Sequence, residues 1–127
     1  MAAGVYTIIC EQGASFRLDL TYTNNDGSPV HLAGYHAAME VRRSRTSNSR
    51  LITQLSTDNG HIQIPAPETG EIRLALPADE TSSLPPGEFF YDLVIWQDTI
   101  YENGERGKEV FRVIEGNFMV RERVTIV

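Results

Sequence analysis

The fold is decided by Glu88-Phe-Phe-Tyr-Asp-Leu-Val-Ile-Trp96, a stretch made almost entirely of aromatic and branched apolar residues. Residues of these types favour pleated strands. Successive side chains of a strand point to opposite faces, so the stretch has two apolar faces. One face carries Phe89, Tyr91, Leu93 and Ile95, and the other carries Phe90, Val94 and Trp96. We therefore predict a central strand with one of these faces in the protein core.

The same alternation recurs on both sides of this stretch. In residues 15–22, Phe16, Leu18 and Leu20 alternate with polar residues, which is typical of a half-buried strand. Further strands are predicted at 35–42, 51–55, 61–64, 71–76 and 108–114. Turn residues separate them, as in Asp26-Gly27 and in the polar tip 103–107. Short strands with turns at intervals of about ten residues indicate a β-sandwich or a small barrel.

Two segments depart from the strand pattern. Residues 77–84 begin with helix-start chemistry but have room for about one turn, so we expect one short helical turn near 78–84. Gly116 interrupts an apolar run and predicts a bulge or kink, after which 118–120 and 124–127 end the chain in extended form. The lack of crossover helices excludes a βαβ fold. Residues 1–127 are therefore expected to form one all-β domain, a single antiparallel sandwich of about 7–9 strands.

Length and composition agree with one domain. A chain of 127 residues can bury a core without a metal or a disulfide, and its single cysteine, Cys10, ends the apolar run that starts at Val5. Cys10 is therefore interpreted as a small buried residue. No apolar stretch approaches the ~18–20 residues of a membrane helix, and we expect no membrane contact. The first residues lack a secretory pattern, so cytoplasmic synthesis is expected.

Charge is distributed unevenly along the chain. The net charge of −6 argues against a nucleic-acid binder, because non-specific binding depends on Lys and Arg at the phosphates. Four arginines nevertheless gather in one polar segment, namely Arg42, Arg43, Arg45 and Arg50. The simplest interpretation is a solvated hairpin tip, followed by a site for an acidic protein partner, with nucleic acid a distant third. The four arginines are thus candidates for a protein interface.

Recognised motifs for catalysis or metal binding are missing from the sequence. The three histidines share no ligand spacing, so no metal or cofactor is expected. No serine or cysteine stands in a known nucleophile motif. Glu71 with Glu88 or Asp92 would form the carboxylate pair of a glycosidase if these residues lay on adjacent strands. Exposed carboxylates are common on sandwiches, and we expect no enzymatic activity.

Two aromatic residues of 88–96 are candidates for particular roles. Trp96 is interpreted as packing at the rim of the sandwich or at a subunit contact, with stacking on a sugar as the alternative. Tyr91 follows the turn Pro86-Gly87 by a few residues. The tyrosine of the tyrosine corner in immunoglobulin-like folds likewise follows a turn. In that motif the tyrosine hydroxyl bonds to the turn before its strand. Tyr91 is therefore expected to have a structural role in an immunoglobulin-like sandwich.

Framework segments carry a resemblance along nearly the whole chain. They include Gly13-Ala-Ser-Phe-Arg-Leu-Asp-Leu, Leu84-Pro-Pro-Gly-Glu-Phe-Phe-Tyr-Asp-Leu, 26–35, 70–81 and the closing run 113–120 with 124–125. Together these segments resemble small β-sandwich virion proteins of tailed bacteriophages, among them proteins that collar the tail and hold fibres. The matching positions belong to the framework, and no catalytic residue can be carried over.

The resemblance implies a structural function in the virion. The chain would be a tail or baseplate collar or adapter subunit, assembled in the host cytoplasm, that anchors fibres or other tail proteins. Copies would form a ring or array through the apolar segments 5–9 and 124–127, because edge strands pair readily between chains. Polar tips near Arg45 and Gly104 would meet, basic against acidic. The alternatives are a glycan- or receptor-binding module and a capsid decoration protein.

Overall fold

The structure, a computed structural model, describes residues 4–126. Most of this range is strand. The strands are β1 (Gly4–Val5), β2 (Ile8–Glu11), β3 (Phe16–Thr21), β4 (His36–Arg42), β5 (Leu51–Ser56), β6 (Ile62–Gln63), β7 (Glu71–Leu76), β8 (Gly87–Ile100) and β9 (Arg106–Arg121). A 3₁₀ turn, η1 (Pro67–Thr69), precedes β7, and a short helix, α1 (Ala78–Ser82), follows it. The helix is the turn that was predicted near 78–84.

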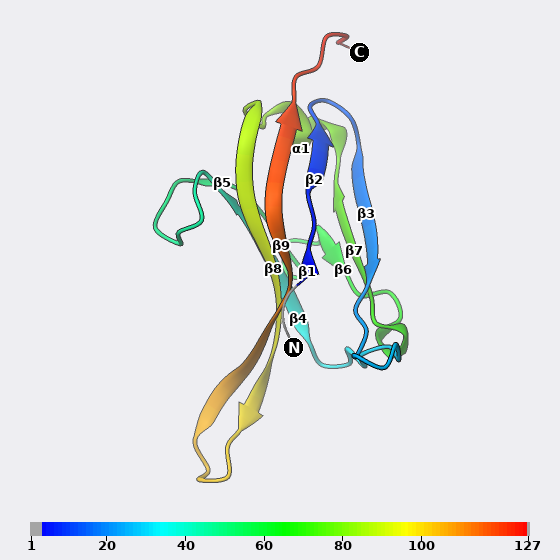
Figure 1. The fold of residues 1–127 in the computed structure, drawn as a ribbon, viewed down its shortest axis with the longest axis vertical. Coiled ribbons are helices and arrows are strands. Elements are labelled where there is room, and N and C mark those ends of the chain that lie inside the picture. Colours follow the sequence, from blue (N-terminus) through cyan, green and yellow to red (C-terminus); the bar gives the residue numbers. More distant parts are fainter. Residues whose placement is uncertain (1–3, 127) are drawn as a thin grey trace.

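The strands form two sheets that share one core (Figure 1). One sheet has the order β1-β9-β8-β4-β5, with β2 also paired to β9, and the other has the order β3-β7-β6. This division of the strands is that of an immunoglobulin-like sandwich, which confirms the predicted all-β fold. The expectation of purely antiparallel pairing was wrong at one edge, because β1 and β2 both run parallel to β9.

The core lies between the two sheets, as the alternating patterns predicted. Strand β8 is central, since it lies between β9 and β4. Its odd-numbered face is the one that enters the core, with Phe89, Tyr91, Leu93 and Ile95. The opposite sheet contributes the buried face of β7, with Ile72, Leu74 and Leu76. Cys10 is also fully buried, which confirms its interpretation as a core residue.

Strand β9 differs from the prediction near Gly116. The strand continues through Gly116, which lies directly opposite Tyr91. The irregularity in register comes earlier, because Leu93 pairs with Ile114 while Val94 pairs with Arg112. Glycine is needed at 116 for another reason: a Cβ there would lie 2.3 Å from the carbonyl oxygen of Tyr6. Residues 122–126 lie outside any strand, so the extended ending predicted at 124–127 is wrong for 124–126, and Val127 lies outside the described residues.

Strands β8 and β9 extend beyond the sandwich as a two-stranded ribbon (Figure 1). We call residues 97–109 the arm. Within the arm, Gln97 pairs with Glu109 and Ile100 with Arg106, and the tip is the polar turn predicted at 103–107. The arm projects from the end of the sandwich opposite to α1. Because β8 continues into the arm, it is longer than the strand 88–96 expected from the sequence.

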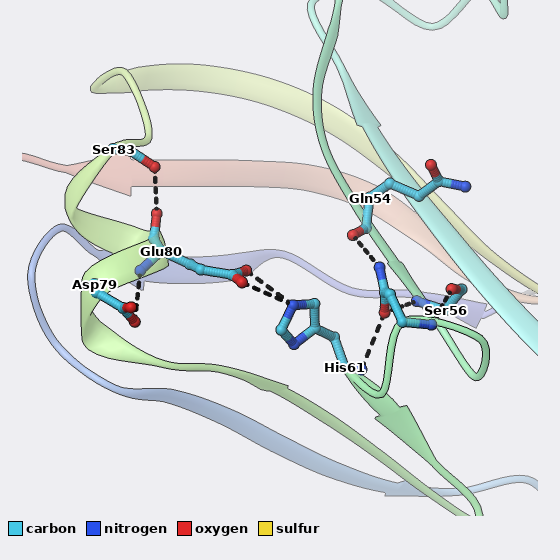
Figure 2. A network of polar contacts seen from close by, with 7 residues as sticks. Gln54, Ser56, His61, Asp79, Glu80 and Ser83 are labelled. Carbon is cyan, nitrogen blue, oxygen red and sulfur yellow. Dashed lines mark hydrogen bonds and ion pairs between the residues drawn. The ribbon is translucent and has the colours of Figure 1, made fainter.

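Helix α1 is tied to the two sheets by polar contacts. The buried hydroxyl of Thr81 donates to the carbonyl of Ala14 at 2.8 Å and accepts from the amide of Gly13 at 3.1 Å. On the other side, His61 Nε2 lies 2.9 Å from Glu80 Oε2 (Figure 2). These contacts hold the loops at this end of the sandwich. No helix in the described range is long and apolar enough to cross a membrane.

Candidate functional site

The four candidate arginines lie at the tip of the hairpin formed by β4 and β5, as expected for a loop between antiparallel strands. We call residues 43–50 the arginine loop. The amide of Arg43 donates to the carbonyl of Arg50 at 3.0 Å and closes the loop. Inside it, the hydroxyl of Ser49 donates to the carbonyl of Thr46 at 2.7 Å. The loop therefore has its own internal hydrogen bonds, and it projects to one side of the sandwich (Figure 1).

The arginines have different surroundings. Arg42, at the end of β4, forms an ion pair with Glu40 at 2.7 Å and donates to the carbonyl of Ser49 at 2.6 Å. The guanidinium of Arg45 lies over the ring of Phe90, with its Cζ 4.8 Å from the ring centroid. Arg43 and Arg50 are exposed. Arg42 thus supports the loop, while the other three arginines present charge at its surface.

A hollow of about 380 Å³ lies between the arginine loop and the outer face of the larger sheet. We call it the basin. Its lining includes Arg42 and Arg45 from the hairpin, Phe90 and Asp92 from β8, and Arg112 and Glu115 from β9. The even-numbered face of β8 therefore forms the floor of the basin, while the odd-numbered face fills the core.

Charges inside the basin are largely paired with one another. Arg112 Nε lies 3.3 Å from Asp92 Oδ2, and Arg112 Nη1 lies 3.3 Å from Glu115 Oε2. Arg42 is paired with Glu40, as described above. Exposed pairs of this kind contribute little to stability, but they leave no row of free donors for a small anion. Arg45, at the rim above Phe90, is the lining arginine that has no carboxylate partner among residues 4–126.

Trp96 lies apart from the basin, where the arm leaves the sandwich. It is half-buried on the outer face of β8, opposite Val110. The His36 ring packs against it with a centroid separation of 5.5 Å, and Lys108 Nζ lies 5.8 Å from its centroid. A sugar would need a free ring face for stacking. The flanking His36 and Lys108 side chains leave Trp96 better suited to packing at the rim.

Tyr91 contacts a different partner from the one that a tyrosine corner predicts. Its hydroxyl donates to the backbone carbonyl of Tyr6 at 2.7 Å, whereas we expected a bond to the turn before β8. Burial is the main cause that raises the pKa of the Tyr91 phenol. The predicted hydrogen-bond partner was therefore wrong. The contact is still structural, because it joins the N-terminal edge to β8.

The base of the arm is held by a polar group that sequence reasoning missed. The hydroxyl of Tyr35 donates to Glu109 Oε1 at 2.9 Å, and Gln97 Nε2 donates to both the Tyr35 oxygen and Glu109 Oε1, each at 3.2 Å. Burial and the neighbouring Glu109 carboxylate raise the pKa of Tyr35. This group orients the arm relative to the sandwich.

Large apolar side chains are exposed on the arm and on β9 next to its base. On the arm, Ile100 is 68% exposed and Tyr101 is exposed, and next to the base Val110 is 55% exposed and Phe111 is exposed. The sequence offered one signal for Val110 and Phe111, because the predicted strand 108–114 has apolar residues on both faces. A strand with two apolar faces needs two covering surfaces, and here the sandwich supplies at most one.

Catalytic and metal-binding arrangements find no support in the described residues. Glu71 lies on β7 in one sheet, whereas Glu88 and Asp92 lie on β8 in the other. These carboxylates therefore do not lie on adjacent strands, as a glycosidase pair would require. Among residues 4–126, no three His, Cys, Asp or Glu side chains gather as metal ligands. The surfaces that distinguish this molecule are therefore the arginine loop with its basin and the arm.

Comparisons with known proteins do not assign a function. No protein-family model matches the chain, and no curated protein matches its sequence. Among solved structures, murine CRIg is similar with 12% identity and a TM-score of 0.39, covering 91% of this chain and 92% of that one. A structure from work on the cell-adhesive interactions of VGSC beta subunits is similar with 12% identity and a TM-score of 0.31, covering 97% and 96%.

Proposed function

We propose that this chain is a structural protein of a bacteriophage virion, a collar or adapter subunit that connects tail or baseplate proteins to fibres. It works through protein contacts and catalyses no reaction. The observation that carries the proposal is the arm, a ribbon with exposed apolar residues on a sandwich whose core is already complete. The resemblance of the framework segments to tail proteins supplies the virion context.

The arm is expected to be unstable on its own unless a partner covers its apolar side chains. An isolated two-stranded hairpin is marginally stable in water, and the arm has no third strand beside it in the described residues. Burial of exposed side chains such as Ile100 and Tyr101 would contribute roughly 25 cal/mol for each Å² of apolar area removed from water. A projecting apolar ribbon is therefore best explained as one side of a protein interface.

The edges of the sandwich offer further contacts of the same kind. Val5, Ile9, Val124 and Ile126 are exposed, with Val124 at 96%. A groove of about 380 Å³ runs between β2 and β3, and within residues 4–126 each of these strands pairs on one side alone. Open edges accept strands from other chains. This supports a role in an assembly, whether in the tail or, as an alternative, as capsid decoration.

Glycan binding is the main alternative from another class. It would depend on an open aromatic platform, and Trp96 is flanked by His36 and Lys108. The structure therefore favours an assembly role over sugar stacking. Glycan-array binding that is lost in Trp96→Ala would reverse this preference.

The proposal is tested by following a tagged chain into phage particles. The tagged chain is produced in host cells infected with a phage that encodes this protein. Purified particles are then analysed by quantitative mass spectrometry. We expect a fixed copy number per particle. A variant in which Asn-Gly replaces residues 98–108 should fold, by circular dichroism, and be missing from particles. A wild-type chain that is absent from purified particles would contradict the virion role.

A further inference from the structure

We propose that the arm of one copy docks on the arginine loop and basin of a second copy, so that the chain assembles head to tail. This inference rests on the proposed function and names the partner: another molecule of the same chain. It is drawn from the charge, exposure and position of the two surfaces.

The two surfaces carry opposite charge. Residues 42–50 contain four arginines and no acidic residue. The arm contains four acidic residues, Asp98, Glu102, Glu105 and Glu109, against two basic ones, Arg106 and Lys108. Its tip is the most acidic part, because Glu102 and Glu105 flank the turn. Opposite charges of this kind steer association and select the register of an interface.

The charges at both surfaces are free to pair between molecules. Within residues 4–126, no carboxylate lies within ion-pair distance of Arg43, Arg45 or Arg50, and no cation lies within that distance of Glu102 or Glu105. The arm projects from one end of the sandwich, whereas the arginine loop projects from its side (Figure 1). The two surfaces are therefore positioned to meet in different copies.

The arm also offers an apolar anchor for the basin. The ring of Tyr101 lies against Gly107, where a Cβ would come within 2.3 Å of its Cε2 atom. Tyr101 is thus folded back on the arm, which leaves the neighbouring Ile100 as the free apolar side chain near the tip. The basin has Phe90 on its floor, with the Arg45 guanidinium over the ring. Ile100 would enter the basin while Glu102 and Glu105 meet Arg43 and Arg45.

Contact between two different surfaces has a consequence for symmetry. Each copy presents one arm and one arginine loop, so every contact leaves one free surface of each kind. Such heterologous contacts produce closed rings when the rotation closes, and filaments when it does not. A symmetric two-fold dimer is not expected.

The test uses two charge-reversed variants of the full chain. The arm variant is E102K/E105K, and the loop variant is R43E/R45E. Sedimentation velocity at low salt should show a defined oligomer for the wild type and at least about tenfold weaker association for each variant. Sodium chloride should weaken the wild-type oligomer, because exposed charge pairs are screened. E68K/E71K, which makes the same change of charge in η1 and at the start of β7, serves as the matched control and should assemble like the wild type.

Mixing separates docking between copies from a general charge effect. The arm variant retains an intact loop and the loop variant an intact arm, so each variant should bind the other through one wild-type interface. The reversed arm and the reversed loop also carry opposite charges, so both contacts can form and we expect the mixture to assemble further than either variant alone. A wild-type chain that is monomeric at every concentration overturns the inference, as does an arm variant that assembles normally or a mixture that associates no more than each variant alone.

These results are independent of the particle experiment. A chain found in virions that stays monomeric in solution would leave the structural role standing and show that the arm binds a different protein. A chain that forms the oligomer but is absent from virions would overturn the virion role and leave the head-to-tail contact intact.

Discussion

The hydroxyl of Tyr91 donates a 2.7 Å hydrogen bond to the backbone carbonyl of Tyr6, which lies 85 positions earlier in the chain. Gly116, directly opposite Tyr91 in β9, leaves space for the same carbonyl. The amide of Tyr6 donates to the carbonyl of Glu115 at 3.0 Å. Tyr6 is therefore held on β9 by its own backbone and by Tyr91, between the two short strands β1 and β2.

Tyr91→Phe should weaken this attachment without changing the fold. The variant removes one partly buried hydrogen bond, which costs about 1–1.5 kcal/mol of unfolding free energy. Urea unfolding followed by the fluorescence of Trp96 measures the loss. Tyr22→Phe is the control, because the Tyr22 hydroxyl has no hydrogen-bond partner within residues 4–126, and its effect should stay within about 0.5 kcal/mol. Equal effects of the two variants would contradict the assigned role of Tyr91.

Gly116→Ala should release the N-terminal edge more severely. A Cβ at 116 would lie 2.3 Å from the Tyr6 oxygen, and the nearest atoms belong to backbone that cannot rotate away. We expect a loss of about 2 kcal/mol or more, with faster amide exchange at 5–11 than in the rest of the sandwich.

Gly104→Ala is the matched control for this effect. Gly104 also has a positive φ, 82°, but nothing lies within 4 Å of the position that a Cβ would take. Its substitution should cost about 1 kcal/mol through backbone strain, and it should leave exchange at 5–11 unchanged. Normal exchange at 5–11 in Gly116→Ala would show that Tyr6 does not require a glycine beside it.

Thr81→Val should loosen helix α1, at the end of the sandwich opposite to the arm. The Thr81 side chain is fully buried and bonds to the backbone of both Gly13 and Ala14. Valine keeps the shape and leaves these groups unsatisfied, at a cost of about 1–3 kcal/mol. Ser83→Ala, at an exposed hydroxyl that bonds within the helix turn, should cost less than about 0.5 kcal/mol. Thermal unfolding compares them, and equal midpoints would count against Thr81 as an anchor.

The sequence was sufficient for the parts of the fold in which burial imposes a pattern. Residues such as Leu18, Met39 and Leu74 alternate with small or polar neighbours because one face of each strand meets the core and the other does not. That alternation identified the strands, but the two apolar faces of 88–96 left open which face of β8 enters the core. Cys10 was assigned to the core because it ends the apolar run that starts at Val5.

The remaining features depend on contacts that leave no local pattern. The parallel pairing of β1 and β2 with β9 and the bond from Tyr91 to Tyr6 join opposite ends of the chain. Gly116 was predicted to mark a bulge, whereas glycine is needed there because the carbonyl of Tyr6 lies next to it. The arm was missed because residues 97–100 and 106–109 lie outside the sandwich, where no core imposes an alternation. The arginine loop was predicted from its cluster of charges. The basin beneath it was not predicted, because it depends on how the loop packs over the sheet.

Cys10 gives a prediction about reactivity and pH. Burial, with a smaller contribution from the Glu11 carboxylate, raises the pKa of the thiol from 9.0 to about 11. Since the thiolate is the reactive form, a thiol-specific reagent at pH 8 should modify the native chain at least ~1,000-fold more slowly than the urea-unfolded chain, because access requires opening of the fold. Rapid modification of the native chain would show that β2 detaches readily from β9.

The same shift sets the direction of an alkaline effect on stability. Below pH 9 the thiol is protonated in both the folded and the unfolded chain, so Cys10 contributes no pH dependence there. Between pH 9 and about 11 the unfolded chain releases the proton while the folded chain retains it, so the free energy of unfolding falls as pH rises. Cys10→Ala removes this contribution and keeps Tyr91, whose raised pKa affects both proteins equally. Urea unfolding from pH 8 to 11 should therefore show a steeper loss of stability for the wild type than for the variant, and parallel curves would mean that Cys10 does not remain a buried neutral thiol.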